Sequence, residues 1–213
     1  MNNLVILATH NKCKITEFRP LFEMRGFDLE GLDKFNITED CDEPHDTLQF
    51  NAIDKVNFYH KLLLDNEGAK KQLHMYNKVY IASEDSGLYV KSLPNEVGVK
   101  SKRFAESGND DDNNVLLLSK MFGVANRDAH YDTSLVISPF GNPEFIINTT
   151  GRLSGLIATS ISPHGFAYDK VLIVEYKDEI KYLGELNLDQ KNEISSRRKA
   201  IDSLFTYYLD TKV

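Results

Sequence analysis

The stretch Leu4-Val-Ile-Leu-Ala-Thr9-His-Asn11-Lys-Cys-Lys14 decides the fold, because an apolar run stops abruptly at Thr9 and gives way to a polar turn. This pattern predicts a strand that enters a turn, and the following apolar residues recur at helical spacing: Ile15, Phe18, Leu21 and Phe22. Thr9 and Asn11 then lie where a helix N-terminus offers backbone N–H groups, and Lys14 adds a positive charge. The stretch predicts an αβ unit with a plausible phosphate cradle, although capped helices of this kind are common without one.

The bulk composition describes a globular chain. Its 213 residues are 41% hydrophobic, which suits one larger domain or two lobes that share a sheet. A formal charge of −7 argues against a groove for polymeric nucleic acid, which needs a broad basic surface. Cys13 and Cys41 are isolated, and we find neither a leader peptide nor a membrane-spanning run. We therefore expect a cytoplasmic protein that does not act on membranes.

An acidic run, Glu39 to Glu43, precedes a second predicted helix, Thr47 to Leu64, for which Asp46 or Thr47 can be the cap. Carboxylates are electrostatically favoured near a helix N-terminus. Composition alone therefore gives this run no more than a solvated role.

Glu84 and Asp85 are adjacent carboxylates that follow a compact strand predicted for Val79 to Ala82. Apolar residues resume at Leu88, so we expect Ser83 to Gly87 to contain a turn, which glycine permits. Ligands of α/β sheets usually dock at the carboxyl ends of strands. The pair is therefore the strongest catalytic candidate among the acidic residues.

The polar run Gly108 to Asn114 lacks the ordered spacing of a calcium loop, so we predict a solvated connection that caps a helix over 115–122. Further strands, several of them antiparallel, are expected at 27–32, 131–137, 144–148, 153–157 and 171–176. The last helix is predicted for Ile194 to Leu209, with Ser195 or Ser196 as cap. Its first turn holds Arg197, Arg198 and Lys199, which oppose the helix dipole and are easier to explain if they face an anion.

A set of short segments, in order along the chain, resembles the inosine triphosphate pyrophosphatase family. The segments are Thr9-His-Asn11-x-x-Lys14 with Glu17; Glu43 with Asn51-Ala52 and Lys55; Ala82 to Gly87; Gly98-x-x-Ser101-x-Arg103-Phe104; Gly165 to Asp169; and Lys191-x-x-Ile194-Ser195-Ser196-Arg197. Each segment is short, but independent matches in the same order are improbable.

The resemblance implies that residues 1–213 form a single α/β domain, elongated and two-lobed, with a long mixed β-sheet flanked by helices and a nucleotide cleft between the lobes. Family members commonly form homodimers. The activity it implies is Mg²⁺-dependent hydrolysis of non-standard purine nucleoside triphosphates (ITP, dITP, XTP) to the monophosphate and pyrophosphate, which cleanses the nucleotide pool.

The resemblance also implies roles for individual residues. Asp85 would be the general base and, with Glu43, would hold Mg²⁺. The triphosphate would be held by Thr9, Asn11, Lys14 and Lys55, and the remaining substrate contacts would come from Ser86, Phe166, Ala167, Tyr168, Asp169, Lys191, Ser196 and Arg197.

The chemistry is coherent with the residues present. Attack of water on the α-phosphorus needs a carboxylate to activate the water and cations to neutralise phosphate oxygens. Glu43, Glu84 and Asp85 can supply the first requirement, and Lys14 and Lys55 the second. A site of one or two carboxylates completed by substrate phosphates also suits Mg²⁺.

Departures from the family pattern are concentrated near the base. Ser196 stands where the family has His, Ala167 where Gly is usual, Lys170 in place of a Pro, and Val97 in place of another Pro. One alternative is a pyrophosphatase with altered base specificity, for pyrimidine or modified nucleotides. A second alternative is a nucleotide-binding module that does not hydrolyse, against which the three retained carboxylates argue.

Overall fold

The computed structural model describes residues 2–209 and contains one mixed sheet of seven strands in the order β2-β1-β3-β4-β5-β6-β7. The strands are β1 (Asn3–Leu7), β2 (Phe27–Gly31), β3 (Val79–Val90), β4 (Asp128–Pro139), β5 (Ile147–Ile157), β6 (Leu172–Tyr176) and β7 (Glu179–Tyr182). β1 is parallel to β2 and β3, whereas β6 is antiparallel to β5 and β7. The predicted α/β class with a mixed sheet is confirmed.

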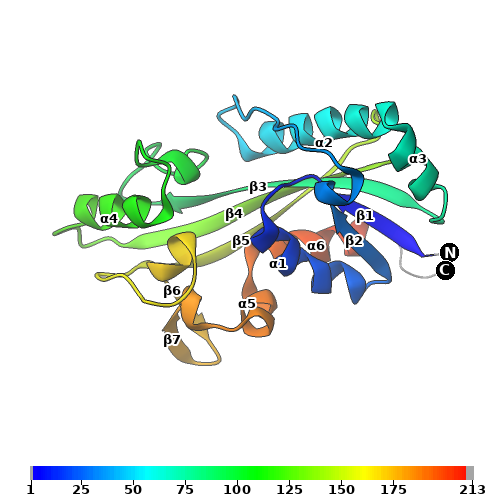
Figure 1. Ribbon diagram of the computed structural model, residues 1–213. Coiled ribbons are helices and arrows are strands. Elements are labelled where there is room, and N and C mark those ends of the chain that lie inside the picture. The colour runs from blue at the N-terminus through cyan, green and yellow to red at the C-terminus, as the bar shows by residue number, and fades with distance from the viewer. Residues whose placement is uncertain (1, 210–213) are drawn as a thin grey trace. The chain divides into compact units, whose positions relative to one another are not determined.

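Six α-helices accompany the sheet in the described residues (Figure 1). They are α1 (Lys12–Glu23), α2 (Leu48–Asp65), α3 (Glu67–Leu73), α4 (Asp110–Lys120), α5 (Leu188–Ile194) and α6 (Ser196–Tyr207). None of them, within residues 2–209, has the length and apolar character needed to cross a membrane.

The chain divides into two compact units. In the described part, the first comprises residues 2–85, 133–151 and 197–209, and the second comprises residues 86–132 and 152–196. β3, β4 and β5 each contribute residues to both units.

In the first unit, β1 is buried on both of its faces, which explains its uninterrupted apolar sequence. Val5 and Leu7 pack in a core with residues of α1 and α6, while Leu4 and Ile6 pack in a second core with residues of α2 and α3. Figure 1 shows α1 and α6 on one side of β1 and β2, and α2 and α3 on the other. Alternation along a strand therefore decides which pair of helices a side chain meets.

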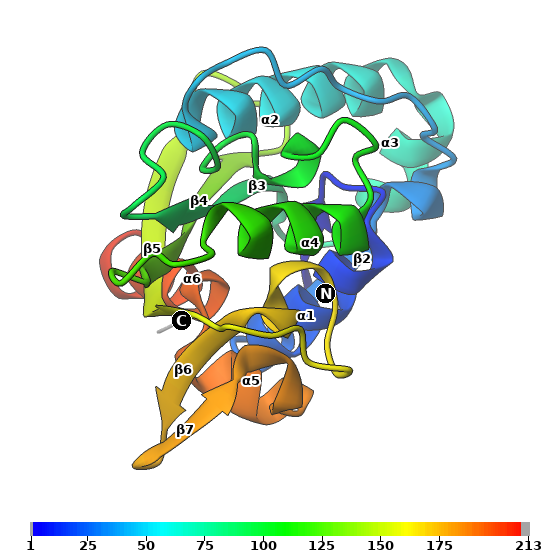
Figure 2. The same ribbon diagram turned by 90° about the vertical axis from the view of Figure 1, so that its left-hand side faces the viewer.

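In the second unit, α4 packs against the short 3₁₀ helix Ala167–Lys170, and β6 and β7 form a hairpin with α5 beside it (Figure 2). The hairpin turn uses Lys177 and Asp178, both at positive φ, as a two-residue turn between twisted strands requires. One core, which includes Leu88, Leu117 and Val171, holds these elements together.

Several predicted boundaries were wrong. β3 runs without a turn through Ser83 to Gly87. Gly87 is instead needed because a Cβ there would lie 2.3 Å from the carbonyl oxygen of Gly98. α4 begins inside the polar run, since the side chain of Asn109 accepts from the N–H groups of Asp111 and Asp112.

The end of the chain also differs from its prediction. A capping box of Asn187 and Gln190 starts an extra helix, α5, and the extended backbone of Ser195 separates it from α6. One strand, β5, replaces the two predicted at 144–148 and 153–157, and it begins at Ile147. β7 was not predicted, because its alternation of polar and apolar residues spans only four positions, the shortest run that indicates a strand.

Candidate active site

The turn between β1 and α1 is ordered by its own side chains. The carboxamide oxygen of Asn11 accepts from the N–H groups of Cys13 (2.9 Å) and Lys14 (3.4 Å), and the hydroxyl of Thr9 accepts from the N–H of Asn11 (3.2 Å). Two of the backbone N–H groups expected to face an anion are therefore used by the helix cap. What Asn11 can offer phosphate is its amide NH₂ group, which the cap does not use.

Glu84 and Asp85 point to opposite faces of β3, as neighbours on a strand must. Glu84 shares the α1 and α6 side with Ala82, and Asp85 shares the α2 side with Ser83, whose hydroxyl donates to the carbonyl of Ala52 at 2.5 Å. Both carboxylates are buried, with 3% of Glu84 and 6% of Asp85 exposed.

On the α1 and α6 side, two cations converge on one oxygen of Glu84. Lys14 Nζ lies 2.9 Å from Glu84 Oε1, and Arg197 donates to the same oxygen from Nη2 at 3.1 Å. Arg197 also pairs with Glu17, which is buried on α1. Burial by itself raises the pKa of Glu84, but Lys14 and Arg197 outweigh it and lower that pKa to about 2.

On the α2 side, two carboxylates share one cation. Lys55 Nζ lies 2.5 Å from Glu43 Oε1 and 3.5 Å from Asp85 Oδ1. Burial, with the repulsion of Glu43 and Glu84, raises the pKa of Asp85 despite Lys55. Burial opposes the charge of Lys55, yet Asp85 and Glu43 raise its pKa. Lys55 is therefore a fixed positive charge, whereas the negative charge of Asp85 is incompletely compensated.

The donor set of this second cluster fits Mg²⁺. Oxygens of Glu43 and Asp85 already converge on one cation, the Lys55 ammonium, and carboxylate oxygens are the ligands that Mg²⁺ takes. No group of three or more His, Cys, Asp or Glu side chains suited to a metal occurs in residues 2–209. A site of two carboxylates leaves positions for phosphate oxygens and water.

The second unit gathers three of the residues predicted to contact the base. Lys191 Nζ lies 2.6 Å from Asp169 Oδ2, and both residues are buried. The same ammonium lies 4.4 Å from the ring centre of Phe166, which is 38% exposed. An exposed ring beside a buried ion pair is suited to stacking against a planar ligand.

The remaining predicted substrate contacts lie in helical or strand elements. The hydroxyl of Tyr168 donates to the carbonyl of Ser101 at 2.7 Å, and burial raises the pKa of Tyr168. Ala167 has φ of 47°, a left-handed conformation that favours glycine and costs about 1–2 kcal/mol with a Cβ. Ser196 is buried at the start of α6, and Ser86 follows Asp85 in β3.

Comparisons with known proteins identify the family. Residues 5–207 match the Ham1 family over nearly the whole chain.

This protein belongs to the Ham1 family.

Its relatives include the dITP/XTP pyrophosphatase of Bacillus subtilis, 34% identical over 93% of each chain, and that of Lactobacillus acidophilus, 32% identical over 96% of each chain. The solved structure of the Staphylococcus aureus Ham1 protein is 29% identical, with a TM-score of 0.75 and coverage of 96% of this chain and 97% of that one. The family resemblance predicted from the short segments is confirmed.

Two residues of this Ham1 protein were given no role by the sequence reasoning. Glu17 lies on the buried face of α1 between Lys14 and Leu21. An acidic residue on an apolar helix face is unusual, and this could have indicated a role for Glu17. Asn51 is a polar residue with no exposed surface on α2, and its available signals were its place in the Asn51-Ala52 segment and its helical spacing from Leu48 and Lys55. The cationic first turn of α6 does face anions, but these are the carboxylates of the protein itself.

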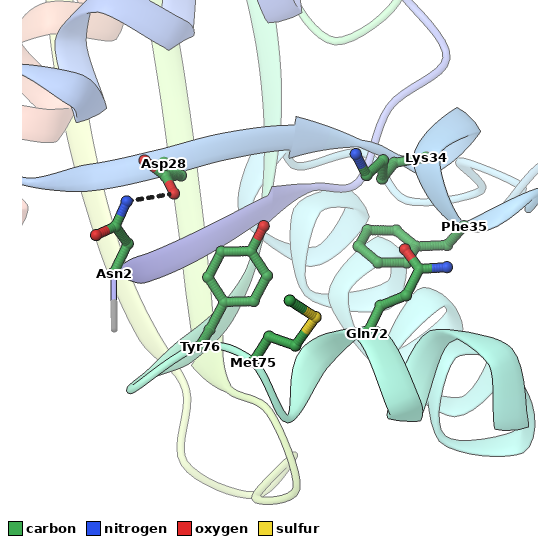
Figure 3. Close-up of a pocket in the computed structure, with 7 residues that line it drawn as sticks. All are labelled: Asn2, Asp28, Lys34, Phe35, Gln72, Met75 and Tyr76. Atoms are coloured by element: carbon green, nitrogen blue, oxygen red, sulfur yellow. Dashed lines mark hydrogen bonds between the residues drawn. The ribbon is translucent and has the colours of Figure 1, made fainter.

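A separate hollow in the first unit of the Ham1 protein has a volume of about 390 Å³ (Figure 3). The amide of Asn2 donates to Asp28 at 3.0 Å at its edge. Its lining residues are Asn2, Asp28, Lys34, Phe35, Gln72, Met75 and Tyr76. None of these residues belongs to the ion clusters, so the hollow is no part of the candidate site.

Proposed function

We propose that this protein is a nucleoside triphosphate pyrophosphatase that hydrolyses non-standard purine nucleotides (dITP, XTP and ITP) to the monophosphate and pyrophosphate. The observation that carries the proposal is the Lys55 cluster, in which a buried lysine meets Glu43 and Asp85 on the face of β3 opposite to the Lys14 and Glu84 pair. Relatives that match more than 90% of this chain are named dITP/XTP pyrophosphatases.

In this proposal, the triphosphate is bound by Lys14, Lys55, Thr9 and Asn11. Lysine is a compact point charge, so it suits the several oxygens of a polyphosphate. The ordered turn before α1 keeps Lys14 beside the helix N-terminus, where an anion is favoured. The positive charges lie in local clusters within an acidic chain, which favours a small polyanion over polymeric nucleic acid.

Asp85 is proposed as the general base, and Glu43 with Asp85 as the residues that would hold Mg²⁺. Asp85 accepts a proton from water as the water oxygen bonds to the α-phosphorus, and the bond from this phosphorus to the bridging oxygen breaks. The electron pair leaves with pyrophosphate. When bound, Mg²⁺ neutralises charge on the phosphate oxygens.

The base is proposed to stack on Phe166 and to be read by polar groups. These are Asp169, Lys191, Ser196, Arg197 and the backbone of Ala167 and Tyr168, with Ser86 as a further substrate contact. Hypoxanthine and xanthine carry an oxygen acceptor where adenine carries an amino donor, so ATP should be a poor substrate. We propose that residues 1–213 work as a single catalytic domain.

A nucleotide panel tests the proposal. The wild-type protein is assayed with Mg²⁺ on dITP, XTP, ITP, GTP, ATP and dUTP, with pyrophosphate and orthophosphate measured separately. We expect pyrophosphate, fastest from dITP, XTP or ITP, with loss of the rate in a chelator and recovery on adding Mg²⁺. Orthophosphate as the product overturns the mechanism, and a preference for dUTP favours the altered base specificity suggested by Ser196, Ala167 and Lys170. Binding without turnover favours the non-hydrolysing module.

We also propose that the protein acts in the cytoplasm as a homodimer, since its proposed substrates belong to the nucleotide pool. Light scattering after size-exclusion chromatography tests the dimer. Cell fractionation with an antibody against the chain tests the location.

A further inference from the structure

The carboxamide of Asn51 joins two parts of the site that are far apart in sequence. Asn51 has no exposed surface, and its Nδ2 donates to Asp85 Oδ2 at 3.1 Å. The same nitrogen donates to the carbonyl oxygen of His45 at 3.2 Å, and Oδ1 accepts from the N–H of His45 at 2.9 Å. One side chain therefore holds β3 and the loop that precedes α2.

These bonds fix the orientation of the carboxamide. An amide NH₂ group has two hydrogens, and here one acceptor is present for each, while the oxygen has a donor. Reversal of the amide would place Oδ1 against the carboxylate of Asp85 and the carbonyl of His45. Because such contacts are strongly unfavourable in a buried site, the donor must face Asp85.

The loop held by Asn51 carries the second carboxylate of the cluster. Glu43 is two residues before His45 and reaches the same Lys55 ammonium as Asp85. The imidazole of His45 also pairs with Asp54 of α2 at 2.7 Å, so the loop is attached to α2 at two points. The location of Glu43 relative to Asp85 thus depends on a chain of short contacts that begins at Asn51.

We propose that Asn51 is a positioning residue, which orients the carboxylate of Asp85 and sets the distance between Asp85 and Glu43. The inference rests on the proposed function, because it assigns Asn51 to the same reaction. Asn51 touches no reacting atom in this scheme. It acts through Asp85 and through the backbone of His45.

Asn51→Asp is the most informative substitution because it keeps the shape and the acceptor for His45 N–H. It removes both donors and places a carboxylate against Asp85. We expect kcat for dITP to fall by about a hundredfold, the cost of a misplaced catalytic group, while KM changes by less than about threefold because Lys14 is untouched. A kcat within about threefold of wild type in the folded variant overturns the inference.

Asn113 provides a matched control in the second unit. It is also buried, and its carboxamide accepts from the N–H of Ala105 (2.7 Å) and donates to the carbonyl of Lys102 (3.0 Å). Asn113→Asp removes the donor to a backbone carbonyl, as Asn51→Asp does, but in the unit that does not contain Asp85. We expect its kcat to stay within about threefold of wild type, and an equal loss of kcat in both variants overturns the positioning role.

A charge exchange tests the contact without any activity measurement. In the double variant Asn51→Asp with Asp85→Asn, a carboxylate and an amide again face each other, with donor and acceptor exchanged. We expect its Tm to exceed that of Asn51→Asp alone, since the repulsion between two carboxylates is removed. A double variant no more stable than Asn51→Asp overturns the contact.

These outcomes separate the inference from the proposed function. Wild-type protein that releases no pyrophosphate contradicts the function, while the charge exchange still reports on the contact. An active wild type with an equally active Asn51→Asp variant contradicts only the role of Asn51.

Discussion

Glu84 and Asp85 are neighbours on β3, but their surroundings compensate their charges to different degrees. Glu84 shares one oxygen with Lys14 and Arg197, and its pKa is lowered to about 2. Asp85 shares Lys55 with Glu43, and burial raises its pKa. One residue step along a strand therefore separates a carboxylate that contacts two cations from a carboxylate that shares a single cation with Glu43.

This difference teaches which carboxylate suits which task. A carboxylate held charged by two cations is a poor proton acceptor and a good anchor, so Glu84 fits the task of holding Lys14 and Arg197 in place. A carboxylate with a raised pKa accepts a proton more readily. Asp85 therefore fits the general base, and Glu84 fits the anchor of Lys14 and Arg197.

Asp85→Asn should have the largest effect, because it keeps the shape of the side chain and removes the proton acceptor. We expect kcat to fall by about 10²–10⁴-fold with folding intact. Steady-state release of pyrophosphate from dITP measures the loss, and circular dichroism checks folding. Asp65→Asn, at an exposed position of α2, is the control for loss of one charge. A nearly normal rate in Asp85→Asn excludes Asp85 as the base.

Lys14→Ala should weaken substrate binding rather than the chemical step. Loss of a charged hydrogen bond to phosphate costs about 1.5–3 kcal/mol, so KM should rise roughly ten- to a hundredfold. Lys12→Ala removes the same charge from an exposed position of α1 and should leave KM unchanged. Equal KM values for the two variants would show that net charge, and no specific contact of Lys14, governs binding.

Glu84→Gln should lower stability more than it lowers the rate of the chemical step. It leaves Lys14 and Arg197 without their shared carboxylate, although Arg197 keeps Glu17. We expect the free energy of unfolding in urea to fall by about 1–3 kcal/mol. Glu23→Gln, an exposed pair partner of Arg19, should change it by less than about 1 kcal/mol. A kcat loss as large as that of Asp85→Asn would reverse the division of roles.

Much of this site follows from sequence patterns that are local. The capped turn at Asn11 depends on short-range geometry and was predicted, as was the α2 cap, for which Thr47 was one of two candidates. The pairing of Arg197 with Glu17 joins residues 180 positions apart, and no pattern along the chain encodes that distance. The uninterrupted β3 was also missed because of a contact between residues separated in sequence. Gly87 is required by the close approach of the Gly98 backbone, and not by a turn.

His60 is a buried titratable group without a counter-charge among its contacts in the described part of the chain. We expect it to have a small effect on how the free energy of unfolding depends on pH. Only 1% of His60 is exposed, its Nε2 accepts from the N–H of Gly141 at 2.9 Å, and within residues 2–209 its Nδ1 has no hydrogen-bond partner. Burial lowers the pKa of His60 below 6.5. The unfolded chain therefore binds this proton more readily than the folded chain, so the stability that neutral His60 contributes is present above pH 6.5 and is lost as the pH falls below it.

The slope from one such group is at most about 1.4 kcal/mol per pH unit. His60→Gln keeps an acceptor for Gly141 but cannot be protonated. Urea unfolding of wild type and variant between about pH 5 and 7.5 should give free energies that diverge below the ordinary histidine pKa, with wild type losing more. The other histidines are present in both proteins, so the difference isolates His60. Parallel curves would mean that burial does not lower the pKa of His60. They would also weaken the argument that burial raises the pKa of Asp85.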